Sequence, residues 1–304
     1  MSENILDKLI ATIDCKQGAV RNVRFNNDGQ YCLSCGSDKS IKLWNPHRQL
    51  MLKTYSGHGY EVLDAHSSGD NSQICSGGMD KSVILWDVAS GKVLRKYRGH
   101  VGTVSCVKFN EESSVILSGS VDGTIRSWDC RSRKMDPIQI LNEAKDSVTS
   151  VQVSDHEILS GSGDCRIRRY DLRIGRLICD YVGKTVTCVN FTRDDQCVLV
   201  SSLDGVVRLF DKQTGELLNE YKGHKNTDYK IDSCMNDKDD QVLSGSEDGH
   251  VYIWDLIEAK VKKKLYHETT RPIHSLSHHP KRTCLLTASG GNIYLWLSPY
   301  ETDQ

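Results

Sequence analysis

Long apolar segments are missing from this sequence. No stretch approaches the ~20 consecutive apolar residues of a membrane-spanning helix, although 38% of the 304 residues are hydrophobic. An excess of one charge is missing too, because 39 Lys and Arg face 40 Asp and Glu, and the formal net charge is −1. This balance argues against the basic footprint of a stand-alone nucleic-acid-binding domain. We therefore expect a soluble protein that binds no membrane and makes no direct sequence-specific contact with nucleic acid.

The first ten residues, MSENILDKLI, lack the basic start, apolar core and cleavage site of a signal peptide. We expect a protein of the cytoplasm, the nucleus or both, where the 12 cysteines stay reduced and pack as small apolar side chains. Cys32 and Cys35 form a C-x-x-C pattern, but residues three apart on a strand point to opposite faces. No second cysteine pair stands at zinc-finger spacing, so no metal site is predicted.

Signatures of common enzyme sites are also missing. The sequence has no phosphate-binding loop, no dinucleotide fingerprint and no G-x-S-x-G elbow. We therefore predict no catalytic residue and no cofactor, and expect that the protein is not an enzyme.

What the sequence does contain is a repeated unit of about 42 residues. Each unit has a turn followed by a short apolar run that ends in an aromatic residue, and the intervals between these endings are 42, 42, 42, 40, 44 and 42 residues. The seven endings are Trp44, Trp86, Trp128, Tyr170, Phe210, Trp254 and Trp296. Four strand-like runs per unit and Trp-Asp endings are typical of WD-repeat propeller blades.

The repeats predict an all-β fold, a single seven-bladed WD-repeat β-propeller over residues 1–304. The last unit stops just after Trp296 without a fourth strand, whereas residues 9–13 form a spare strand before the first unit. We predict that this segment, Leu9 to Ile13, pairs with the strand from Ile293 to Leu297, completes blade seven and removes an open sheet edge.

Four polar or aromatic positions recur in three repeats and predict a side-chain network inside each of these blades. In each set the histidine is expected to bridge the turn aspartate and a serine, and the serine to accept from the indole N–H. The sets are His58, Ser76, Asp80 and Trp86; His100, Ser118, Asp122 and Trp128; and His224, Ser244, Asp248 and Trp254. A His-Ser-Asp trio resembles a hydrolase triad, but a catalytic site would occur once and not in three blades. We interpret these sets as satisfied buried networks that rigidify the core.

The ring has two faces. We expect the loops that lead into the first strand of each unit to lie on one face, called the top, together with the turns between the second and third strands. Candidate partner-binding residues on this face are Tyr60, Glu61, Met79, Lys225, Tyr229 and Arg271, because Tyr, Met and Arg are enriched at interfaces. On the bottom face, turns between strands one and two are acidic and those between strands three and four mostly basic, with Arg131 and Arg133 as further candidates. These bottom charges are either solvated surface with local ion pairs or an electrostatic docking ring.

Several longer stretches resemble one particular family. They are TYSGHGYEVLDA at 54–65, LWDVASGKVLRKYRGH at 85–100, VILSGSVDGTIRSWDCRSR at 115–133, VSDHEILSGS at 153–162 and TGELLNEYKGHKN at 214–226. They are similar to the MAP kinase organizer 1 family, also called WD repeat-containing protein 83. The resemblance implies a non-catalytic scaffold of cytoplasm and nucleus. Its implied partners are members and adaptors of the extracellular signal-regulated kinase (ERK) module, a prolyl hydroxylase of the hypoxia pathway, and splicing factors.

We favour a scaffold that assembles kinase-signalling complexes, acting as a monomer within larger assemblies. The alternative is a structural component of the spliceosome in pre-mRNA splicing, and the two roles are compatible. A ubiquitin-ligase adaptor or another binding module is a third hypothesis.

Overall fold

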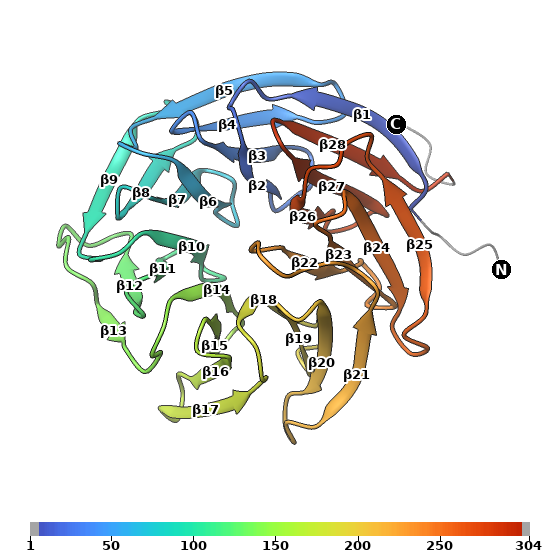
Figure 1. Ribbon diagram of the computed structural model, residues 1–304. Helices are drawn as coiled ribbons and strands as arrows, with labels where there is room; N and C mark the ends of the chain where they lie inside the picture. The colour runs from blue at the N-terminus through green and yellow to red at the C-terminus, as the bar shows by residue number, and fades with distance from the viewer. Residues whose placement is uncertain (1–5, 300–304) are drawn as a thin grey trace.

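The computed structural model describes residues 6–299, which form seven four-stranded antiparallel sheets arranged as blades around a central axis (Figure 1). Within residues 6–299 every regular element is a strand, and this part contains no helix long and apolar enough to span a bilayer. The predicted fold class, a seven-bladed β-propeller, is confirmed. Residues 1–5 and 300–304, the ends of the predicted 1–304 propeller, lie outside the described residues.

Each blade has four strands, ordered outward from the centre. The innermost strands are β2 (Val20–Phe25), β6 (Val62–Ser67), β10 (Val104–Phe109), β14 (Val148–Val153), β18 (Val186–Phe191), β22 (Ser233–Met235) and β26 (Ile273–His278). The second strands are β3 (Cys32–Gly36), β7 (Gln73–Gly78), β11 (Val115–Ser120), β15 (Glu157–Ser162), β19 (Cys197–Ser202), β23 (Gln241–Gly245) and β27 (Cys284–Ser289).

The two outer layers complete the blades. The third strands are β4 (Ser40–Asn45), β8 (Ser82–Asp87), β12 (Ile125–Asp129), β16 (Arg166–Asp171), β20 (Val206–Asp211), β24 (His250–Asp255) and β28 (Asn292–Leu297). The outermost strands are β5 (Leu50–Ser56), β9 (Val93–Arg98), β13 (Gln139–Leu141), β17 (Arg176–Tyr181), β21 (Leu217–Lys222), β25 (Val261–Tyr266) and β1 (Lys8–Asp14). Blades one to six follow the chain, and blade seven takes its outer strand from the N-terminal end.

Closure of the ring follows from this last strand. β1 pairs antiparallel with β28, with Leu9 opposite Trp296 and Ile13 opposite Ile293, and Figure 1 shows the blue strand beside the red one. Ala11 and Ile13 are buried in a hydrophobic cluster that also contains residues of β2 and β28. The predicted closure by the N-terminal strand is confirmed, and it covers what would otherwise be an open edge.

The apolar core lies between neighbouring blades. One cluster joins Ile41 and Tyr55 of blade one to Val62, Ile74 and Trp86 of blade two. The blades approach so closely that a Cβ on Gly77 would lie 2.5 Å from a methyl group of Val104 in the next blade. Glycine is therefore required at this position of the second strand by interblade packing.

Candidate protein-interaction surfaces

Two of the three predicted blade networks are formed. In blade two, His58 lies between Asp80 (Nδ1 to Oδ1, 2.9 Å) and Ser76 (Nε2 to Oγ, 2.8 Å). The indole N–H of Trp86 donates to the same serine oxygen at 2.8 Å. In blade three, His100, Ser118, Asp122 and Trp128 repeat these contacts at the same distances. Each network ties the turn between strands two and three to the preceding top loop and to the third strand.

The aspartates of these networks are held as anions. Burial alone would raise the pKa of Asp80, but hydrogen bonds from His58, Ser82 and the N–H of Gly59 outweigh it and lower the pKa well below its ordinary range. For His100, burial lowers the pKa although Asp122 opposes this shift. The carboxylates are therefore structural hydrogen-bond acceptors, and no step of acid–base chemistry is required of them.

The third predicted network, that of blade six, is not formed, and this prediction is corrected. Neither ring nitrogen of His224 has a hydrogen-bond partner among the described residues. The indole N–H of Trp254 donates instead to the carbonyl of Lys222 at 3.0 Å, and Ser244 donates to the carbonyl of Gly245. The cause is Tyr252, which stacks on Trp254 with ring centroids 5.6 Å apart and donates its hydroxyl to Asp248 at 2.8 Å.

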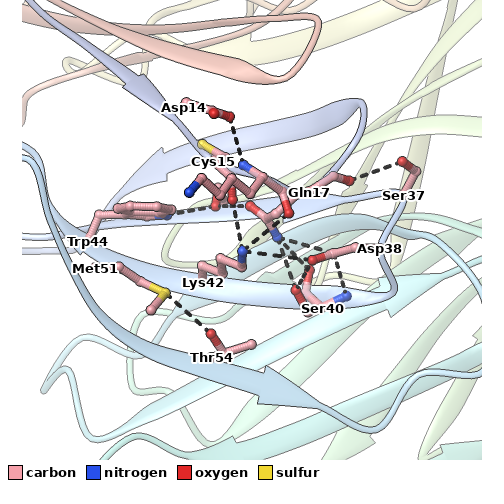
Figure 2. Close-up of polar contacts among 12 residues, drawn as sticks. Asp14, Cys15, Gln17, Ser37, Asp38, Ser40, Lys42, Trp44, Met51 and Thr54 are labelled. Carbon is pink, nitrogen blue, oxygen red and sulfur yellow. Dashed lines mark hydrogen bonds and ion pairs between the residues drawn. The ribbon is translucent and has the colours of Figure 1, made fainter.

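Sequence inspection missed a network in blade one, where glutamine takes the place of histidine. The side-chain amide of Gln17 donates to Asp38 (3.4 Å) and to Ser40, and its carbonyl accepts from Ser34. Trp44 donates to Ser34 at 2.8 Å. Figure 2 shows Gln17, Asp38 and Ser40 joined by these contacts. The sequence signal for this network is the glutamine at the position of the histidine, because a side-chain amide offers both a donor and an acceptor.

In blades four and five an arginine of the third strand binds the turn aspartate that a histidine binds in blades two and three. Arg168 binds Asp164 at 2.5 Å and Ser162 at 2.8 Å, and Arg208 binds Asp204 at 2.6 Å in the same way. Arg168 is 3% exposed, and Arg169 is also buried. Two arginines of repeat four are therefore internal ion-pair partners and not part of a solvated surface.

Three of the predicted top-face candidates meet at the upper mouth of the central channel. Glu61, Met79 and Tyr229 line one cavity of about 330 Å³. Arg21, Lys230 and His274 also line it. Tyr229 packs edge-on against His274 with ring centroids 5.4 Å apart, and Arg21 pairs with Glu61 at 3.1 Å. The structure thus assembles a mixed aromatic, apolar and charged mouth from loops of several blades.

The loop that carries Tyr229 is organised by one buried carboxylate. Glu247 accepts backbone hydrogen bonds from Thr227 (2.7 Å), Asp228 (2.6 Å) and Tyr229 (3.2 Å). Burial would raise the pKa of Glu247, but these hydrogen bonds and that of the Thr227 hydroxyl lower it to about 2. This positioning residue was not recognised in the sequence, because nothing there shows which backbone groups a turn carboxylate will meet.

The remaining candidates lie apart from this mouth. Tyr60 is 64% exposed, with the ammonium of Lys39 5.6 Å from its ring centroid. Lys225 reaches Glu247 at 3.5 Å, and Arg271 lies against Gly290 in blade seven. Arg131 and Arg133 are exposed on the bottom loop between β12 and β13, so the structure separates them from the top-face residues. Whether any of these residues binds a partner stays a prediction.

Within residues 6–299, one group of side chains has the mutual distances of metal ligands: His156, Glu157 and Asp171, whose candidate atoms lie within 4.8 Å of one another. Glu157 is already paired with the ammonium of Lys212 at 2.7 Å and with Arg169 at 3.8 Å. These cations neutralise the carboxylate that a metal would need. We therefore interpret the group as an ion-pair cluster.

Comparison with known proteins agrees with this architecture. The family model "WD domain, G-beta repeat" matches residues 7–45, 50–87, 91–129, 175–211, 215–255 and 260–296. The chain is therefore a WD-repeat β-propeller, a class of typically non-catalytic protein-interaction platforms.

The chain is 62% identical over 289 residues to WD repeat domain-containing protein 83 of Homo sapiens, covering 95% of this chain and 91% of that protein. It is 64% identical over 285 residues to the protein of the same name from Danio rerio, covering 94% and 90%. It is 36% identical over 307 residues to the Dictyostelium discoideum homolog, covering 92% and 94%. The chain belongs to the WD repeat domain-containing protein 83 family, and the predicted family is confirmed.

Proposed function

We propose that this protein is a non-catalytic scaffold that assembles multiprotein signalling complexes, with the ERK/MAP kinase module as its main client. The family resemblance of the sequence points to kinase-cascade members and their adaptors, and to a hypoxia-pathway prolyl hydroxylase as a further partner. The cytoplasm and the nucleus are its proposed locations.

The observation that carries the proposal is the upper mouth of the channel. Its lining comes from blades one, two, three, six and seven, so residues distant in sequence present one continuous surface. Tyr229 and Met79 are about half exposed there, and aromatic residues, Met and Arg are enriched at protein interfaces. The blade-two network holds the turn that carries Met79, and Glu247 holds the loop that carries Tyr229. This order lowers the ordering cost of binding.

A scaffold of this kind accelerates reactions between two clients by raising their effective concentration on one platform. Output depends on how many platforms hold both clients. At low scaffold concentration, added scaffold assembles more complete complexes. At high concentration, each client occupies a separate platform.

The test is a reconstituted kinase phosphorylation assay with fixed client concentrations and scaffold varied from well below to well above them. Phosphorylation is expected to rise and then fall. An enzyme acting on the pathway would give a plateau instead. A monotonic curve, with both clients shown to bind at separate sites, would contradict the proposal and favour a structural role in the spliceosome.

A further inference from the structure

A repeated contact on the bottom face ties neighbouring blades together. In blade two, the guanidinium of Arg95 in the outermost strand donates to the carbonyls of Cys130 and Arg131 in blade three, at 3.1 and 3.2 Å. Lys53 in blade one and Asn219 in blade five reach the equivalent carbonyls of the next blade in the same way. Each contact joins the outermost strand of one blade to the hairpin after the third strand of the next, and so closes the junction between them.

Blade three lacks this bridge to blade four within residues 6–299. Its outermost strand, β13, has three residues, whereas β9 of blade two has six. The position of Arg95 is occupied by Gln139, which is exposed. The hydroxyl of Tyr97 adds a second bond at the bridged junction, to the carbonyl of Asp129 at 2.9 Å. In blade three this position is Leu141, which has no donor to offer.

A groove of about 510 Å³ lies at this unbridged junction, between two neighbouring blades of the ring (β10–β13 and β14–β17 in Figure 1). Leu117 and Ile158 are its buried apolar lining residues. Ile138, just before β13, and Leu172, in the hairpin after β16, also line it and are 60% and 51% exposed. Both blades therefore present accessible aliphatic surface to the same groove.

The charged residues that line the groove are all acidic. Glu111 and Glu112 belong to the turn between β10 and β11, Asp155 belongs to the equivalent turn of blade four, and all three are exposed. Within residues 6–299 the lining contains no lysine or arginine, since Arg131 and Arg133 of the adjacent loop lie outside it. Charge complementarity therefore favours a basic occupant over an acidic one.

We propose that this groove binds an extended segment of a partner protein that carries bulky aliphatic side chains next to lysine or arginine. The aliphatic side chains cover Ile138 and Leu172 and supply most of the affinity, because apolar burial outweighs exposed ion pairs. The cations meet the acidic rim and select the segment. An extended backbone fits because β13 is the free edge of its sheet, and such an edge accepts a further strand.

The inference rests on the proposed scaffold function and extends it with a second docking surface. The groove lies on the bottom face, whereas Met79 and Tyr229 line the mouth on the top face. A client held at one surface therefore leaves the other open, and one molecule can hold two different clients at once.

The experiment measures fluorescence anisotropy of a labelled eight-residue peptide, in which two leucines alternate with two arginines between glycine-serine ends, titrated with the full-length protein. One counterpart has serine in place of both leucines, and another has glutamate in place of both arginines. The first peptide is expected to bind at least about tenfold more tightly than either counterpart, because each counterpart loses the apolar or the charge contribution. The methyl resonance of Ile138 should shift during the titration, which places the peptide in the groove.

The double variant Ile138→Glu with Leu172→Glu should weaken binding at least about tenfold, because it removes the apolar contacts of the groove. Both side chains are exposed, and circular dichroism checks that the variant is folded. The matched control is Leu50→Glu with Leu217→Glu, which changes similarly exposed leucines of β5 and β21 and should bind the peptide like the native protein.

Equal affinity for either counterpart peptide, unchanged binding by the groove variant, or no binding at millimolar protein would each overturn the proposal. The kinase titration described above is independent of this measurement. Failure here therefore leaves the scaffold proposal standing, and failure there leaves the groove standing as a peptide-binding site.

Discussion

The hydroxyl of Tyr252 donates a hydrogen bond to Oδ2 of Asp248 across 2.8 Å. In the equivalent turns of blades two and three, the aspartate is hydrogen-bonded to a histidine instead. The position of Tyr252 is occupied in blade two by Ile84, an apolar residue that cannot compete for the carboxylate. In blade three the equivalent residue is Arg126, whose guanidinium donates to the Thr124 hydroxyl and leaves Asp122 to His100.

The presence of the histidine hydrogen bonds in blade two and their absence in blade six predict responses of different size to the same substitution. His58→Phe should lower the free energy of unfolding by roughly 1–3 kcal/mol, because Asp80 and Ser76 lose a buried partner. His224→Phe should change it by less than about 1 kcal/mol, because a ring without hydrogen bonds is replaced by an apolar ring. Denaturant unfolding of both variants measures the contrast. Losses of the same size at the two sites would contradict the hydrogen-bond assignment.

Ring closure can be tested by placing a charge at two positions of β1. Ile13 is 4% exposed and Leu9 is 40% exposed. Ile13→Asp should destabilise the protein by about 3 kcal/mol or more, because it buries an unpaired carboxylate and detaches β1 from β28. Leu9→Asp is the control and should cost less than about 1 kcal/mol.

Size-exclusion chromatography supplies a second readout for the closing strand. The edge of β28 becomes unpaired when β1 detaches, and an unpaired edge promotes association between chains. Deletion of residues 1–14 should therefore produce soluble aggregates. If this truncated protein stays monomeric with an unchanged melting temperature, the closing strand has no stabilising role.

The top face, with Tyr229 in its mouth and the exposed ring of Tyr60 outside the mouth, is predicted to be the principal client surface. Tyr60→Ala combined with Tyr229→Ala should weaken capture of a kinase client by about tenfold or more, since exposed tyrosines anchor interfaces. Thermal stability should be unchanged, because Tyr60 is 64% exposed and Tyr229 47%. Arg131→Glu with Arg133→Glu is the matched bottom-face variant. Capture that survives the tyrosine pair but is lost on this charge reversal would assign the client to the bottom face.

The loop that carries Tyr229 should depend on pH through Glu247. Its pKa is lowered to about 2 from an ordinary 4.5, so folding favours the anion. The stabilisation is fully present above pH 4.5 and is lost as pH falls towards 2. Amide hydrogen exchange of Thr227, Asp228 and Tyr229 should accelerate over that range. The variant Glu247→Gln, which cannot titrate, should show no such step, and an identical pH profile in both proteins would refute the assignment.

Much of the candidate site follows from position within a repeat. Glu61, Met79 and Tyr229 could be assigned to the top face because antiparallel strands put alternate loops on opposite faces. Their meeting at one mouth could not be assigned, because loop length and backbone hydrogen bonds such as those to Glu247 set where each side chain ends. Only the tertiary structure therefore shows that Glu61 and Tyr229 line the same cavity.

The sequence by itself determined the repeat, the number of blades and the closing strand, because these depend on periodic burial that each unit carries locally. Only the tertiary structure decided which networks form and which groups share a cavity. Phe25, Phe109 and Phe191 stand 84 and 82 residues apart, and nothing local marks them as neighbours. They line one cavity because the closed ring brings the ends of its innermost strands around a single axis, a consequence of closure that no single repeat contains.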